Sequence, residues 1–104
     1  MANPNRGEVE LKAGDKTYVL VFSINALCEA EELVGVNILG DLIKLSTLRN
    51  VLWAGLRTKQ PDVTKGEAGD MIQVLGVDAI RDIVVKAMAL AFPPKEREKT
   101  ANPQ

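Results

Sequence analysis

The sequence contains no histidine and only one cysteine, Cys28. Histidine is the usual acid or base of catalysis near neutral pH, and zinc sites need several histidine or cysteine ligands. No paired catalytic carboxylates or lysines are apparent, so we expect no enzyme activity, no metal and no cofactor. A single cysteine excludes an internal disulfide and is typical of a reducing cytosol. Since no basic residue adjoins Cys28 to activate its thiol, we expect a small buried side chain there.

Long apolar runs and excess basic charge are also missing. No apolar run reaches the roughly 18 residues of a membrane span, and the N-terminus does not resemble a signal peptide. We therefore expect a cytoplasmic protein with no membrane partner. The formal net charge is −1, with acids and bases interspersed. Because nucleic-acid binding needs a basic face that neutralises phosphates, we expect no nucleic-acid partner.

What the chain does contain is the balance of a globular domain, with 46% apolar and 26% charged residues. Two N-terminal segments have the features of strands. Residues 8–12 alternate polar and apolar side chains, and residues 17–22 are rich in β-branched and aromatic ones. Turn-forming residues separate the segments, so we predict a β-hairpin. A helix must cover its apolar face, because two strands alone are marginal in water. The residues of that face are Tyr18, Leu20 and Phe22.

Apolar residues recur at helical spacing in the rest of the chain. Ser23 can cap a first helix that ends at Gly35. We expect its inner face to be apolar and its outer face to be acidic. Residues 38–45 read as a short helix or turn of unusual apolarity. A second helix, capped by Ser46, would run to about Thr58. The inner face of the first helix would comprise Ala26, Leu27, Ala30, Leu33 and Val34, and that of the second Leu48, Val51, Leu52 and Gly55.

The third predicted helix has the clearest local signal. Thr64 and Glu67 have the spacing of a capping box, in which the hydroxyl and the carboxylate each accept a hydrogen bond from a backbone N–H. Apolar residues then keep helical spacing up to Leu75, and Gly76 ends the helix.

The last predicted helix is capped by Asp78, and Asp82 can pair with Lys86 one turn later. Residues 83–92 carry only one charge. They therefore present more apolar surface than a single contact face requires. Either this helix is central to the fold or its spare face pairs with another chain, which leaves a homo-oligomer open. We favour the central position.

These segments predict an α+β fold that is mostly helical, with an N-terminal β-hairpin followed by about four helices. Residues 1–7 would be a flexible leader. Residues 8–92 would form a single domain, and residues 93–104 would be a disordered charged tail.

Two groups of residues are candidates for partner binding. Arg49, Trp53 and Arg57 form one stripe along a helix, and Trp with Arg is typical of interface hot spots. The alternative, which we favour, is that the arginine stems cover a partly buried Trp of the core. The second group consists of apolar residues in the segment 38–45, for which we also favour the core. Its candidates for partner binding are Leu39, Leu42 and Ile43.

Five short motifs follow one another along nearly the whole chain. They are Arg6-Gly7-Glu8-Val9-Glu10-Leu11, Leu27-Cys28-Glu29-Ala30-Glu31-Glu32-Leu33-Val34-Gly35, Leu52-Trp53-Ala54-Gly55-Leu56-Arg57, Thr64 to Gly69 with Asp70 and Ile72, and Ala89-Leu90-Ala91-Phe92-Pro93. In this order they resemble the small tail proteins of gene transfer agents and related siphophages. The resemblance covers Arg6 to Pro93, and the order of the motifs carries it.

That family is usually described as tail assembly chaperones, and in some descriptions as tail tube proteins. The resemblance implies a protein that binds the tape measure protein and keeps it soluble until tail tube subunits polymerise around it. Other tail proteins would be further partners, and the chaperone would not remain in the finished particle. No catalytic residues carry over. A structural component of the tail tube or its end is the first alternative, followed by an enzyme and then by a DNA-binding regulator.

Overall fold

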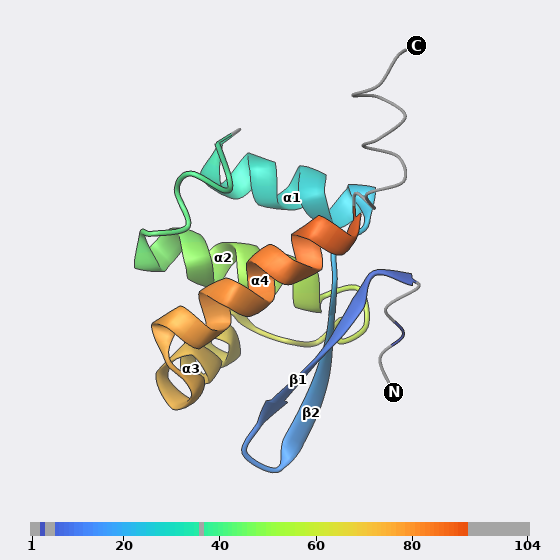
Figure 1. The fold of residues 1–104 in the computed structure, drawn as a ribbon, viewed down its shortest axis with the longest axis vertical. Helices are drawn as coiled ribbons and strands as arrows, with labels where there is room; N and C mark the ends of the chain where they lie inside the picture. The colour runs from blue at the N-terminus through green and yellow to red at the C-terminus, as the bar shows by residue number, and fades with distance from the viewer. Residues whose placement is uncertain (1–2, 4–5, 36, 92–104) are drawn as a thin grey trace.

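The computed structural model describes residues 3, 6–35 and 37–91. Its elements in chain order are β1 (Glu8–Ala13), β2 (Lys16–Val21), α1 (Ile24–Val34), α2 (Leu45–Leu56), α3 (Lys65–Leu75) and α4 (Val77–Ala91). This order confirms the predicted α+β fold, a hairpin followed by four helices in the described part of the chain (Figure 1). The predicted tail, residues 93–104, and Phe92 at the expected end of the last helix lie outside the described residues.

The hairpin is antiparallel, and Leu11 lies opposite Tyr18 in its register. Gly14 in the turn has φ +65°, a conformation that two-residue hairpin turns favour and that glycine adopts without steric cost. Leu20 and Phe22 are buried and Tyr18 is half-buried, as the alternation predicts. The helices supply the cover that this face needs, since α2 and α4 both contact β2.

The core is built around α2, the helix with the largest set of buried side chains. It contacts α1, and α4 crosses it in front (Figure 1). We predicted the central position for residues 83–92, and α4 fits this only in part: Val84 is fully buried, whereas Val85 is 43% exposed. One face of α4 therefore packs against the core, and the opposite face meets solvent. The buried residues of α2 are Thr47, Leu48, Val51, Leu52, Ala54, Gly55 and Leu56.

Four helix ends lie where the sequence predicts them. The Ser23 hydroxyl accepts from the backbone N–H of Ala26 at 3.1 Å, at the start of α1. At the start of α3, the Thr64 hydroxyl accepts from Glu67 N–H at 3.0 Å and the Glu67 carboxylate accepts from Thr64 N–H at 2.9 Å. This confirms the capping box. Gly35 and Gly76, with φ +91° and +98°, end α1 and α3.

Three predicted helix details are wrong. Ser46 lies inside α2, whose N-cap is Lys44 without a side-chain cap, although α2 ends at Leu56, close to the predicted end at about Thr58. Asp78 lies in the first turn of α4 and pairs with Arg81 at 2.9 Å. Asp82 and Lys86 make no ion pair in the described structure. Exposed i, i+4 pairs stabilise a helix only weakly, so their spacing alone does not ensure contact.

The start of β1 is connected to the residues before it. The backbone N–H of Asn3 donates to the buried Glu8 carboxylate at 2.8 Å, and Lys59 Nζ lies 3.3 Å from the same carboxylate. The Asn3 hydrogen bond chiefly, with the Lys59 and Arg6 charges, lowers the pKa of Glu8 below its ordinary value, and burial opposes the shift. The described part of the predicted leader is therefore bonded to the strand at Asn3.

Candidate functional site

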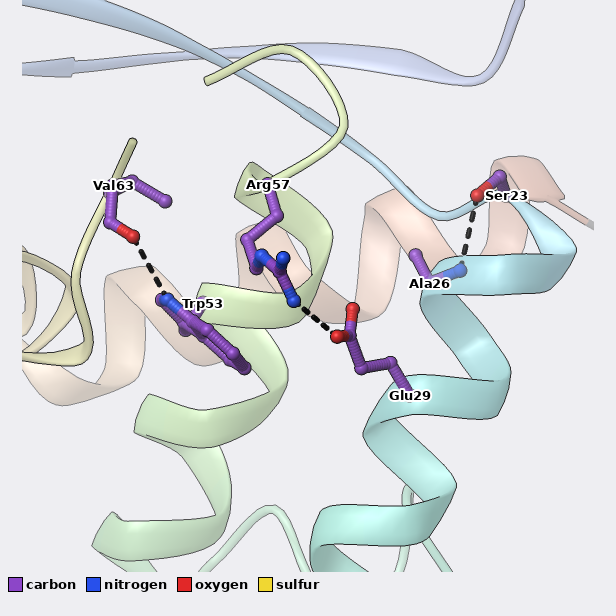
Figure 2. Close-up of polar contacts among 6 residues, drawn as sticks. All are labelled: Ser23, Ala26, Glu29, Trp53, Arg57 and Val63. Atoms are coloured by element: carbon purple, nitrogen blue, oxygen red, sulfur yellow. Dashed lines mark hydrogen bonds and ion pairs between the residues drawn. The ribbon is translucent and has the colours of Figure 1, made fainter. Parts of the chain in front are cut away.

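Trp53, the centre of the predicted arginine–tryptophan stripe, is half-buried and has partners within the chain. Its indole Nε1–H donates to the backbone carbonyl of Val63 at 3.0 Å (Figure 2). The Arg57 guanidinium lies 4.7 Å from the centre of the ring, and Lys65 Nζ lies 5.0 Å from it. The hydrogen bond to Val63 joins α2 to the loop before α3, and the cation–π contact of Lys65 joins the same ring to the first residue of α3.

The two arginines of the stripe separate. Arg57 forms an ion pair with Glu29 of α1, as Figure 2 shows. Arg49 donates to its neighbour Asn50, at 3.2 and 3.4 Å, and its side chain faces Gly69 of α3. The structure thus brings Trp53 and Arg57 together and places Arg49 elsewhere. Trp53 is therefore partly buried as expected, but of the two arginines it is the guanidinium of Arg57 alone, and not the stems of both, that lies over its ring.

The apolar segment 38–45 divides between core and surface. Leu42 is 2% exposed, and Arg81 Nε donates to its carbonyl at 3.3 Å. Leu39 and Ile43 are 60% and 77% exposed. Our expectation of core positions is therefore right for Leu42 and wrong for these two, because the segment forms turns that bury only part of its apolar side chains.

One apolar groove lies between α1, the segment after it and α4; we call it the α1 groove. It encloses about 420 Å³. Ile24, Leu27 and Cys28 line it from α1, at the i, i+3, i+4 spacing that places side chains on one helix face. Leu39 lines the facing side. The remaining lining residues are Glu31, Asn37, Ile38 and Met88.

A second groove, the α2–α3 groove, encloses about 460 Å³ beside the start of α2. Leu45, which is 61% exposed, and Arg49 line it from α2, and Ile72 and Val77 line it from the other side. The segment that carries the exposed Leu39 and Ile43 therefore runs from one groove to the other. The remaining lining residues are Ser46, Gly69, Gln73 and Gly76.

Two expectations about α1 are wrong, and both concern its outer surface. Cys28 is exposed and lines the α1 groove rather than the core. Leu33, predicted to face inward, is 38% exposed. Sequence reasoning also missed Ile24, which is 68% exposed. The spacing of Ile24, Leu27 and Cys28 is the signal that indicates a second apolar stripe on this helix.

Both grooves are lined mostly by apolar residues, so they can bury apolar side chains of a partner. Within the described ranges, no group of three or more His, Cys, Asp or Glu residues is placed to hold a metal ion. No helix among them has the length and apolarity needed to cross a bilayer. Comparison of the chain with protein families, curated proteins and solved structures gave no match.

Proposed function

We propose that this protein is a non-enzymatic tail assembly chaperone that binds the tape measure protein in the cytoplasm of a bacterial host. It keeps this long helical client soluble until tail tube subunits polymerise around it. The resemblance of the five motifs suggests the client. The observation that supports a binding role is the pair of apolar grooves with the exposed apolar segment 38–45 between them.

The grooves suit an amphipathic helix. Such a helix inserts apolar side chains at i, i+3, i+4 and i+7 into an apolar groove. Leu39, Ile43 and Leu45 are each at least 60% exposed, although they lie within eight residues of one another. Clustered apolar exposure of this kind marks interaction surfaces in monomeric proteins.

A structural subunit of the tail tube, or of its end, is the second candidate. Tube folds are usually rich in strand. In the part of the chain that the structure describes, the only sheet is the two-stranded hairpin β1–β2. This content favours the chaperone.

Co-expression with the tape measure protein separates the two candidates. As a chaperone, the protein is expected to make its client soluble, to co-purify with it and to be missing from purified particles. A client that stays insoluble, together with many copies of this chain in the particles, would establish the structural role instead.

A matched pair of variants tests whether the α1 groove is the contact. Leu39→Glu places a charge in the groove, whereas Val85→Glu places one on an exposed apolar position that lines neither groove. Burying a Leu side chain is worth about 1.5–3 kcal/mol, so we expect Leu39→Glu to weaken client binding about ten- to a hundredfold. Val85→Glu is expected to bind as the wild type does. Equal binding by both variants would exclude the α1 groove.

Cys28 gives an independent measurement on the unmodified chain. It is the only cysteine, it is exposed, and it lines the α1 groove. A bound helix would cover its thiol, so its reaction with N-ethylmaleimide should slow when the client is present. Persistent binding with an unchanged reaction rate would place the client on another surface.

A further inference from the structure

The hairpin has two outer edges, and the structure closes one of them with a side chain. The Gln60 amide accepts a hydrogen bond from Val19 N–H at 2.7 Å and donates to the Val19 carbonyl at 3.0 Å. Gln60 therefore imitates a neighbouring strand at the middle of β2. Unpaired strand edges promote association, and proteins commonly protect them.

These bonds also fix which backbone groups of β1 point outward. The backbone N–H and carbonyl of Val19 point away from β1. Glu10 lies opposite Val19 in the register, so the backbone N–H and carbonyl of Glu10 point away from β2. The direction of the backbone groups alternates along a strand, so those of Glu8 and Lys12 also point outward. Glu8 agrees, because its N–H donates to the Asn3 carbonyl at 3.1 Å, outside the hairpin.

Glu10 and Lys12 form the open part of this edge. Neither makes a backbone hydrogen bond outside the hairpin or an ion pair within the described structure, and both are exposed. At the turn the hairpin lies next to α3, where Ala13 and Gly14 line a pocket together with Met71 and Val74; Glu10 and Lys12 are not among the residues that line it. The chain thus closes β2 at Val19 and β1 at Glu8, and leaves a short accessible edge between Glu8 and the turn.

We infer that this edge binds a second copy of the same chain, β1 against β1 in antiparallel orientation. Leu11 of each copy lies opposite Leu11 of the other, so Glu10 of one copy faces Lys12 of the second, and the reverse. Each such pair of outward-pointing residues exchanges two backbone hydrogen bonds. The contact is self-complementary, as a twofold interface requires. This inference is independent of the proposed client binding.

The charge pattern selects this register. A shift of the pairing by two residues places either Glu10 opposite Glu10 or Lys12 opposite Lys12. Like charges directly opposite destabilise a strand pair, and opposite charges stabilise it. The competing interpretation is that Lys12 alone protects the edge from pairing, in which case the protein is a monomer.

Sedimentation of the full chain across a wide range of concentrations tests the inference. The wild type is expected to show a monomer–dimer equilibrium that high salt weakens, since exposed ion pairs are screened. Glu10→Lys and Lys12→Glu each place like charges opposite one another, and each should weaken dimerisation about tenfold or more. Both side chains are exposed, so neither change should unfold the protein, and circular dichroism checks this.

Restored complementarity is the decisive readout. A chain carrying Glu10→Lys together with Lys12→Glu should dimerise as the wild type does. An equimolar mixture of the two single variants should form a heterodimer, although neither variant pairs well with itself. A wild type that stays monomeric at the highest concentrations would overturn the inference and leave Lys12 as a protective charge. Unchanged dimerisation of both single variants would also overturn it, because the contact would then lie elsewhere.

Discussion

Gly55 tests how tightly the hairpin packs against α2. A Cβ added at Gly55 would lie 2.6 Å from Leu20 Cδ1 and 2.6 Å from Phe22 Cζ. Ordinary carbon–carbon contacts are about 3.5–4.0 Å, so these side chains would have to shift by roughly 1 Å. Leu20 is 0% exposed and Phe22 is 3% exposed, which leaves them little room to move. Gly55→Ala is therefore a test of overpacking in the core.

The expected magnitude follows from two opposing effects. Alanine is better than glycine in a helix interior by about 1 kcal/mol. Overpacking a core typically costs about 1–3 kcal/mol, and contacts this short place Gly55→Ala at the upper end. We expect a net loss of about 1–2 kcal/mol in the free energy of unfolding.

Gly69→Ala is the matched control in α3. Its added Cβ would lie 3.6 Å from Arg49 Cδ, an ordinary contact, so only the helix-propensity gain remains. We expect a stabilisation of about 0.5–1 kcal/mol. Urea unfolding can be followed through the fluorescence of Trp53, the only tryptophan. If Gly55→Ala proves as stable as Gly69→Ala, the close approach of the hairpin to α2 is refuted.

Two further predictions concern local hydrogen bonds. Thr64→Ala removes the capping box of α3 and should lower the free energy of urea unfolding by about 1 kcal/mol; an unchanged midpoint would contradict this. The pKa of Glu8 is lowered by folding, so its contribution to stability is present above the ordinary value of 4.5 and is lost as the pH falls through the lower, folded value. Glu8→Gln should therefore flatten the fall in stability below about pH 5, and an unchanged pH profile would show that Glu8 does not cause it.

Much of the secondary structure could be predicted because its causes are local. The period-two alternation on either side of Gly14 indicates the hairpin, and the spacing of Thr64 and Glu67 indicates the start of α3. Gly35 ends α1 because a positive φ is available to glycine without strain. Each feature involves residues close together in sequence, and its signal is therefore visible in the sequence.

The candidate surfaces could be predicted only in part. Leu39 and Ile43 were identified as apolar excess, yet periodicity could not separate them from the buried Leu42, because a turn has no repeating face. Helix α1 carries two apolar stripes, an inner and an outer one, and either could pack against the core. Ala26 and Ala30 fill the inner one, and Ile24 and Cys28 remain on the α1 groove. Only the helix that packs against α1 decides between two such faces.

By itself, the sequence determined the fold class, the hairpin and the helix ends that glycines and the capping box fix. The tertiary structure alone decided which apolar side chains stay exposed and which strand edge stays open. Gln60 closes the β2 edge at Val19 across 41 residues of chain, and Glu29 pairs with Arg57 across 28. No short-range pattern encodes such contacts, since they depend on how whole elements are brought together in the folded chain.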